Sequence, residues 1–206
     1  MFCCCSTENE EQHVDLSPDA LRNRGLVEVQ KTFADEDLKV FTVTLQGILG
    51  ITVDRSDGHR TLVREVSGGA ASVWNDQNPG RRILPFDHIL EVNGERCLGE
   101  DITGKFEGKE VTLKLQRPHV RTVVLERPGR LGIDVNYRKT SLTPWIAAIS
   151  AGLVDDWNKK QPDLCVLPHD RISEVNGQSG TIETVLEKLR SAEKQMILTV
   201  MHYDEI

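Results

Sequence analysis

The sequence lacks several patterns, and each absence excludes a class of protein. No uninterrupted apolar run approaches the roughly 20 residues that a membrane-spanning helix needs, and no secretory signal follows Met1. The five cysteines contain no Cys-x-x-Cys pair, and the six histidines do not have the spacing of zinc ligands. We therefore expect no membrane-spanning segment, no metal site and no cofactor.

Positive charge is scarce as well. Lys and Arg number 25 against 32 Asp and Glu, which gives a formal net charge of −7 and a pI near 5.4. Nucleic-acid binding relies on clustered Lys and Arg, so we do not expect nucleic acid as a partner. Three adjacent cysteines and two isolated ones, Cys97 and Cys165, do not form a disulfide framework. They are typical of a reducing compartment, and we expect a cytoplasmic protein.

Residues 1–38 form a polar and acidic leader. The stretch "STENEEQ" has no hydrophobic periodicity and is predicted to be disordered. The stretch "LSPDALRNRG" predicts one short helix, with Ser17 as N-cap, Pro18 at the first helical position and Gly25 as the stop.

From Lys39 onwards the sequence repeats itself. "DHILEVNGE" at 87–95 returns as "DRISEVNGQ" at 170–178, an offset of 83 positions (170 − 87). Many of the identical residues keep that offset, among them Trp74/Trp157, Asn75/Asn158, Pro79/Pro162, Leu84/Leu167, Asp87/Asp170 and Asn93/Asn176. So many identities in register indicate two domains in tandem, at 39–117 and 118–206, with "RPHV" (117–120) as a very short linker.

Each copy predicts the same order of short strands and helices. In the first copy, β-rich stretches at 40–45, 51–54 and 61–66 precede the small-residue helix "GGAASVWNDQN". The strand "HILEVNG", which runs into a tight Asn-Gly turn, and the strand at 110–116 follow. The second copy has "RTVVLE", "GIDVNY", "WIAAIS", the helix "AGLVDDWNKKQ", "DRISEVNG", another helix and "MILTVMHY" in the same order. The pattern predicts a mainly β fold of the α+β class.

Both copies resemble the PDZ domain, over residues 39–203. "ILGI" (48–51) and "RLGI" (130–133) stand where that family carries its carboxylate-binding loop, and "GGAA", Asp-x-Ile and Val-Asn-Gly are further marks of it. The resemblance implies two partly open β-barrels or sandwiches, each with about two short helices. It implies a non-enzymatic adaptor or scaffold that binds C-terminal or extended peptides by β-strand addition. Phe86 and His169 depart from the family, which usually has Gly before this Asp.

The resemblance also implies a binding site in each copy. A loop of consecutive free backbone N–H groups can hold a peptide carboxylate, and a glycine lets the chain turn tightly enough for these groups to converge. The next strand would offer an open edge to the peptide, and apolar side chains would surround its last residue, itself expected to be apolar. The expected binding residues are Leu131, Gly132, Ile133, Val135, Ile182, Leu186 and Leu189 in the second copy, and Leu49, Gly50, Ile51 and Val53 in the first. The alternative is that Leu-Gly-Ile is only a turn that enters a core strand.

The two copies differ in their second helix. In the second copy, Thr181 can cap an amphipathic helix, "GTIETVLEKLRS". Ile182 stands where many family members use His to select Ser or Thr, so we expect an apolar ligand residue two places before the terminus. In the first copy three glycines interrupt the equivalent stretch 98–110, and each glycine inside a helix costs about 1 kcal/mol relative to Ala. That helix should be short or frayed, and its groove narrow, altered or only structural.

Other classes of function remain open. An enzyme would need a nucleophile and a base, for which Cys97 or Cys165 with His88 or His169 are candidates. Neither cysteine has a catalytic motif around it, and a buried inert thiol is the expected role. A structural module with vestigial grooves and a regulatory subunit associated with a protease are the remaining alternatives.

Both ends of the chain carry candidate features. Cys3, Cys4 and Cys5 have the pattern of S-acylation acceptors, which would attach the adaptor to the inner face of a membrane, although nearby acidic residues would be repelled by anionic lipids. A metal-binding or simply tolerated cysteine run is the alternative. At the other end, Ile206 offers an apolar residue with a carboxylate, so self-association through a groove is a hypothesis. The alternative is that the chain simply ends there.

Overall fold

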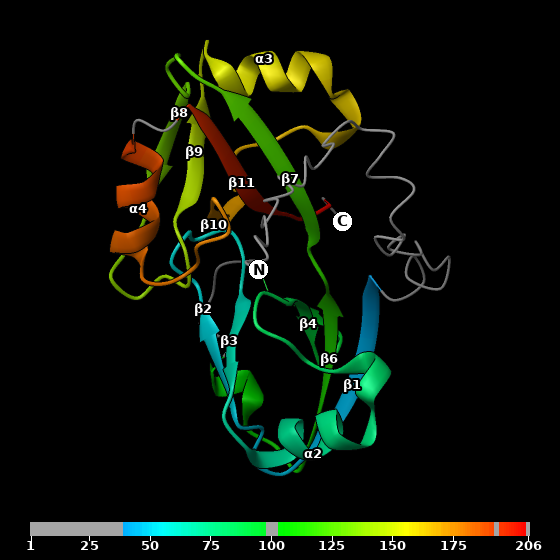
Figure 1. Cartoon of the computed structure of the whole chain (residues 1–206). Helices are drawn as coiled ribbons and strands as arrows, with labels where there is room; N and C mark the ends of the chain where they lie inside the picture. The colour runs from blue at the N-terminus through cyan, green and yellow to red at the C-terminus, as the bar shows by residue number, and fades with distance from the viewer. Residues whose placement is uncertain (1–38, 98–102, 192–193, 205–206) are drawn as a thin grey trace, which may run out of the picture. The chain divides into compact units, whose positions relative to one another are not determined.

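The computed structural model describes residues 39–97, 103–191 and 194–204 (Figure 1). The leader, the short helix expected in it and the three adjacent cysteines lie outside these residues. The described part forms two antiparallel sheets, which belong to one compact unit. Among the described residues, no helix is long and apolar enough to cross a membrane.

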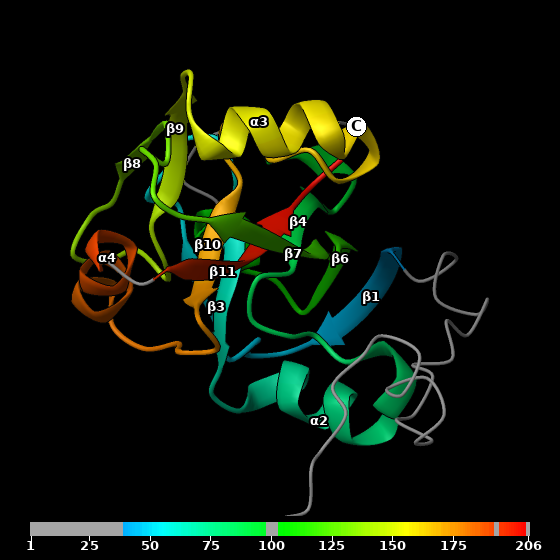
Figure 2. The ribbon, with the colours of Figure 1, turned by 45° about the horizontal axis from the view of Figure 1, so that its top comes forward.

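The first sheet has the strand order β1-β6-β4-β3-β2, with the short β5 paired to β4. Its strands are β1 (Val40–Gln46), β2 (Ile51–Asp54), β3 (Leu62–Val66), β4 (His88–Val92), β5 (Glu95–Arg96) and β6 (Glu110–Gln116). The helix α2 (Gly69–Gln77) and the 3-10 turns η1 (Pro79–Arg81) and η2 (Thr103–Phe106) connect them. Figure 2 shows α2 beside the strands of this sheet.

The second sheet repeats this path, in the order β7-β11-β10-β9-β8. Its strands are β7 (His119–Glu126), β8 (Ile133–Asn136), β9 (Trp145–Ile149), β10 (Arg171–Val175) and β11 (Gln195–His202). It carries the helices α3 (Leu153–Lys160) and α4 (Ile182–Arg190) and the 3-10 turn η3 (Pro162–Leu164). The expected mainly β fold with short helices is therefore confirmed, and both sheets are open rather than closed barrels.

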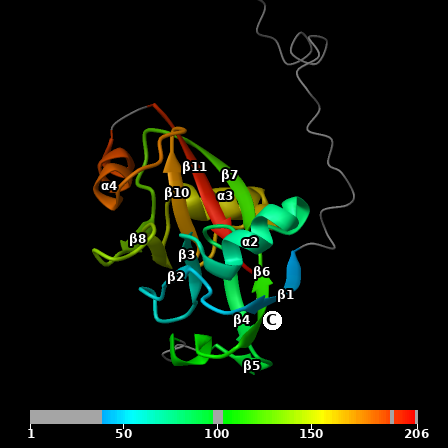
Figure 3. The ribbon, with the colours of Figure 1, turned by 90° about the horizontal axis from the view of Figure 1, so that it is seen from below.

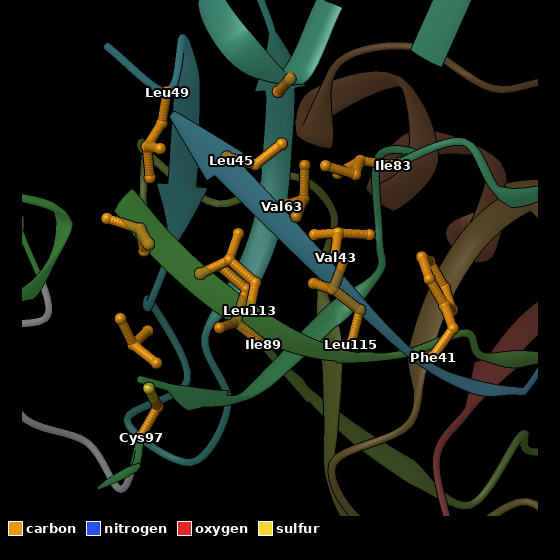
Figure 4. Close-up of a cluster of buried hydrophobic side chains, with 13 residues drawn as sticks. Phe41, Val43, Leu45, Leu49, Val63, Ile83, Ile89, Cys97, Leu113 and Leu115 are labelled. Atoms are coloured by element: carbon orange, nitrogen blue, oxygen red, sulfur yellow. The ribbon is translucent and has the colours of Figure 1, made fainter. Parts of the chain in front are cut away.

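Strict alternation builds each core. Along β1 the buried side chains are Phe41, Val43 and Leu45, while the residues between them are exposed. They pack with residues of β3, β4 and β6 in the cluster that Figure 4 shows, and each buried side chain of this size stabilises the fold by about 2 kcal/mol. β11 buries alternate residues in the same way in the second core, where Val185 of α4 is fully buried. As expected, Thr181 caps α4, because its hydroxyl accepts a hydrogen bond from the Thr184 N–H at 3.3 Å.

The repeated phrase has a structural role in both sheets. Asp87 accepts a hydrogen bond from the backbone N–H of Leu84 at 2.8 Å, and Asp170 does the same with Leu167 at 2.9 Å. These carboxylates fix the turn before β4 and β10. The asparagines of Val-Asn-Gly bind the neighbouring strand. Asn93, in the turn after β4, accepts a hydrogen bond from the backbone N–H of Thr112 on β6 at 2.8 Å. Asn176 accepts from Ile197 at 2.7 Å.

The repeated Trp-Asn pair joins each small-residue helix to the 3-10 turn after it. Asn75 donates to the Ile83 carbonyl and accepts from the Ile83 N–H, and Asn158 binds Val166 in the same two ways. The Trp74 indole N–H donates to a carbonyl of the same segment, that of Arg81, at 2.9 Å. The two segments are therefore held by side chains that both copies share.

Three expectations need correction or completion. The linker is shorter than 117–120, because β6 ends at Gln116 and β7 begins at His119. Phe86 and His169 have φ values of 73° and 69°, a region that favours glycine, at a cost of about 1 kcal/mol at each residue. The helix of the first copy is a single 3-10 turn in its described part, Thr103–Phe106, as the glycines indicate.

A buried ion-pair network joins the second sheet to the turn between β2 and β3. Arg171, the first residue of β10, places Nη1 3.0 Å from Asp54 Oδ2 and Nη2 2.9 Å from Asp57 Oδ2. All three side chains are buried, with at most 1% of any of them exposed. Burial alone would raise the pKa of Asp57, but Arg171 and the backbone N–H groups of Arg60 and His59 outweigh it and lower that pKa. The sequence gives no local sign of this network.

The end of β11 makes a second contact with the first sheet. Tyr203 is buried, and its hydroxyl donates to the Phe86 carbonyl at 2.7 Å. Gln116 donates to the Asp204 carbonyl at 3.1 Å, and His119 Nε2 lies 2.8 Å from the Asp204 carboxylate. Ile206, the candidate for self-association, lies outside the described residues.

Three histidines lie at these contacts. The rings of His59 and His169 are 3.9 Å apart, and His88 faces the edge of the Tyr203 ring at 5.9 Å. Burial lowers the pKa of His88 to about 4, and the Arg60 charge adds to this shift. Burial, His59 and Arg60 together lower the pKa of His169 below 6.5. The folded chain therefore holds these two rings in their neutral forms.

We expect acid to destabilise the protein through these rings. Below pH 6.5 the unfolded chain takes up protons on both histidines, whereas folded His88 stays neutral until the pH approaches 4. The contribution of the neutral histidines to the free energy of unfolding is thus fully present above pH 6.5. It falls as the pH drops towards 4, by about 2–3 kcal/mol for His88. Urea unfolding at pH 7, 6, 5 and 4 measures this fall. The His88→Gln variant should show a flatter profile, and an identical profile would contradict the assignment.

Candidate carboxylate-binding loops and open strand edges

Each Leu-Gly-Ile loop is fixed by hydrogen bonds from the start of the following helix. In the second sheet the carbonyls of Arg130 and Leu131 accept from the N–H groups of Leu153 and Val154, at 2.9 and 3.1 Å. In the first half the carbonyls of Ile48 and Leu49 accept from the second and third residues of α2, Ala70 and Ala71, at 2.8 and 3.0 Å. The loops therefore supply the acceptors that the first turn of a helix lacks.

This pairing turns the loop's own N–H groups away from the helix. In a trans peptide the C=O of one residue and the N–H of the next point in opposite directions. Since the carbonyls of Arg130 and Leu131 point at α3, the N–H groups of Leu131 and Gly132 point away from it. Neither donates to any acceptor in the part of the chain that the structure describes, and the same holds for Leu49 and Gly50. Consecutive free amides of this kind can hold an anion.

The strand after each loop continues this array along an open edge. β2 and β8 are the last strands of their sheets, so each has one edge that no described strand covers. Ile133 pairs with Ile149, and the Ser150 N–H donates to the Gly132 carbonyl at 2.8 Å. That bond makes Ile133 and Ile149 a non-hydrogen-bonded pair, so the N–H and C=O of Ile133 face the open edge. Ile51, with Val66 and the Ser67-to-Gly50 bond at 2.9 Å, is arranged in the same way.

Glycine is required in both loops by its backbone and by its neighbours. Gly50 and Gly132 have φ values of 69° and 74°. A Cβ on Gly132 would lie 2.5 Å from the Ser150 carbonyl oxygen, and one on Gly50 would lie 2.0 Å from the Gly68 oxygen. The residue before α3 is also packed too closely for a side chain, since a Cβ on Gly152 would lie 2.7 Å from the Arg130 oxygen. The small-residue segments are thus small because the loops press against them.

The structure brings most of the expected apolar residues of the second site together. Figures 1, 2 and 3 all show α4 on the β8 side of the second sheet. Leu131, Ile133, Val135 and Leu186 are partly buried and pack against the second core. Ile182 and Leu189 are each 7% exposed, so they are largely covered before any ligand binds, and Leu189 belongs to the core itself.

The first site has the same loop but different neighbouring side chains. Leu49 is buried in the first core, and Ile51 and Val53 are partly buried against it. The residue before the loop, Ile48, is 87% exposed and was not among the residues expected to bind. An apolar residue in a turn between two glycines, "GILG", was the available signal for it. The second helix that would complete this site is represented among the described residues only by η2.

Positive side chains accompany the loop of the second sheet, although backbone amides alone were expected there. Arg130 directly precedes Leu131, and its guanidinium donates to the Ser150 hydroxyl at 3.1 Å. Arg127 donates to the carbonyl of Leu189 in the last turn of α4, at 3.3 Å. The Arg130 charge, next to the loop in the chain, favours an anion there in addition to the loop's N–H groups.

Cys97 and Cys165, the two cysteines that the structure describes, show no catalytic arrangement. Cys97 is buried, its Sγ lies 3.9 Å from the Glu95 carbonyl oxygen, and burial raises the pKa of its thiol. The Cys165 Sγ lies 3.0 Å from the Pro162 carbonyl oxygen. Among the described residues neither thiol is paired with a histidine, and no cluster of three or more His, Cys, Asp or Glu could hold a metal ion.

Comparison with known proteins gives limited likenesses. No family model matches the sequence, and no curated protein does. Among solved structures, the complex of INAD PDZ45 with NG2 peptide is similar at 17% identity, over 81% of this chain and 91% of that chain, with a TM-score of 0.33. The complex of INAD PDZ45 with NORPA CC-PBM is similar at 18% identity, over 82% and 96%, with a TM-score of 0.35. Dlg1 PDZ2 of the choanoflagellate Monosiga brevicollis is similar at 26% identity, over 42% of this chain and 100% of that chain, with a TM-score of 0.33.

All three are PDZ-domain structures.

We expect the Gly132→Ala variant to lose far more stability than its backbone angle alone explains. Gly177 also has a positive φ, 69°, but a Cβ there would meet nothing within 4 Å. Gly177→Ala should therefore cost about 1 kcal/mol, and Gly132→Ala at least about 2 kcal/mol more, because the new Cβ meets the Ser150 oxygen. Urea unfolding of the two variants measures the difference. Equal losses would show that the loop does not press against the helix start.

Proposed function

We propose that this protein is a non-enzymatic adaptor that binds the C-terminal peptides of partner proteins. Residues 39–117 and 118–206 act as two PDZ-like domains in tandem. The observation that carries the proposal is the pair of loops whose N–H groups are free and lead directly onto an open strand edge. A peptide carboxylate would accept from the amides of Leu131, Gly132 and Ile133, and the peptide backbone would pair with β8. The equivalent site at Leu49, Gly50 and Ile51 gives a second edge at β2.

The apolar residues near the second loop support a proposal for the kind of ligand. Ile133, Val135 and Leu186 are partly buried beside the loop and would contact an apolar last residue of the peptide. Ile182, the first residue of α4, offers no hydrogen-bonding group to a Ser or Thr side chain. We therefore propose ligands with an apolar residue both at the terminus and two places before it.

A screen of decapeptides with free C-termini against the full chain tests the proposal. We expect binders with Ile, Leu or Val at the last position, and we expect ¹⁵N amide shifts at Leu131 and Gly132 on binding. Converting the terminal carboxylate of a binder to an amide should weaken it at least tenfold, because the loop offers only donors to that group. A matched peptide with an unchanged carboxylate and a charged last residue controls for the apolar contact. Equal affinity of acid and amide forms would refute the carboxylate-loop assignment, and a screen that yields no binder would favour a purely structural module.

We further propose that acylation of Cys3, Cys4 and Cys5 places the adaptor at the inner face of a membrane. Two or more acyl chains give stable anchoring, whereas one gives only weak binding. The variant with all three cysteines changed to Ser should move from the membrane to the soluble fraction of expressing cells. The Cys97→Ser variant is the matched control and should stay in the membrane fraction. A triple variant that stays with membranes would show that acylation does not place the protein.

A further inference from the structure

The candidate peptide edge of the first sheet ends inside the buried ion-pair network. Asp54 is the last residue of β2, and its carboxylate is held on both oxygens. Oδ1 accepts from the Ser56 N–H at 2.8 Å, and Oδ2 accepts from Arg171 Nη1 at 3.0 Å and from the Leu142 N–H at 2.6 Å. A strand of four residues is thus anchored at one end by groups from the second sheet.

The strand that supports β2 is anchored on the same side. Arg64 lies on β3, beside β2 in the sheet, and donates to the Thr140 carbonyl. Arg60, near the tip of the hairpin, donates to the His169 carbonyl at 3.3 Å. The β2–β3 hairpin of the first sheet therefore has its tip and both its strands in contact with the second sheet and its loops.

The groups that hold the hairpin belong to the segments that form the second site. Leu142 and Thr140 lie on the connection that follows β8, the candidate edge of the second sheet. Arg171 begins β10 and pairs with Trp145 on β9, which in turn pairs with Asn136 at the end of β8. A few residues thus connect the end of β2 with the end of β8.

We propose that Arg171 is a positioning residue for the first peptide site, so that β2 accepts a peptide only while the second sheet holds the hairpin. This inference rests on the proposed peptide-binding function. Arg171 lies at the far end of β2 from the carboxylate loop, and it acts by fixing the strand that the peptide must pair with. Its removal takes away the ion-pair partner of the buried Asp57 carboxylate and leaves Asp54 with only the Arg64 guanidinium, 3.9 Å away, which drives the hairpin out of contact. Strand addition depends on a preformed edge, so a released hairpin binds more weakly.

The test uses the full chain and decapeptides recovered from the free-carboxylate screen. Binding is followed separately at the Gly50 and Gly132 amide signals. In Arg171→Met we expect affinity at the Gly50 site to fall at least tenfold, with affinity at the Gly132 site within threefold of the parent. Arg171→Lys keeps one charge and should recover part of the loss. Arg121→Met is the matched control, because Arg121 donates to the Cys165 carbonyl within the second half of the chain and should leave both affinities unchanged.

The outcomes separate this inference from the function on which it rests. Binding at neither site in the parent chain would overturn both. Binding at Gly132 alone, or an unchanged Gly50 affinity in Arg171→Met, would overturn the positioning role and leave peptide binding in place. If Arg171→Met does not give dispersed amide signals, Asp57→Asn decides, since it keeps the Asp54 link. It should weaken the Gly50 site about threefold, and no change would count against the proposal.

Discussion

One exchange of hydrogen bonds fixes the candidate site in each half of the chain. The carbonyls of a loop satisfy the first N–H groups of a helix, and the peptide geometry then directs the loop's own N–H groups outwards. A loop held in this way is preorganised, because no rearrangement is needed before it can accept an anion. The same contact sets the register of the adjoining strand, because the bond from the Ser150 N–H to the Gly132 carbonyl leaves the N–H and C=O of Ile133 facing the open edge. Glycines on both sides are the condition for this approach.

The local elements could be predicted from the sequence because their signals are local. Alternation specified β1, β6 and β11, the Thr181 cap specified the start of α4, and the Asn-Gly pairs specified the turns after β4 and β10. The site loops were identified through the resemblance of the repeated motifs to a known family, because a glycine between apolar residues is by itself compatible with an ordinary turn. Ile48 was missed because an isolated exposed apolar residue resembles many others on a protein surface.

The contact between the two sheets could not be predicted. Arg171 is 117 residues from Asp54 and 114 from Asp57, so no periodicity relates them. "RSDGHR" reads as a solvent-exposed turn by every local criterion, and the first residue of a strand need not be buried. Only the folded chain shows that the two places meet and that Arg171 binds both carboxylates. The polar residues that look least informative in the sequence are the ones that join the two halves.

The two turns with positive φ contribute to that junction through their main chain. Tyr203 donates to the carbonyl of Phe86, and Arg60 donates to the carbonyl of His169, which occupies the equivalent position in the other half. A carbonyl is present whatever the side chain, so evolutionary drift at positions 86 and 169 leaves both contacts intact. Asp54, Asp57 and Arg171 bind through their side chains, so a change in one of them takes a partner away from a buried charge. Substitutions at these three positions must therefore be correlated, whereas the carbonyl contacts of positions 86 and 169 impose no such condition on the side chains there.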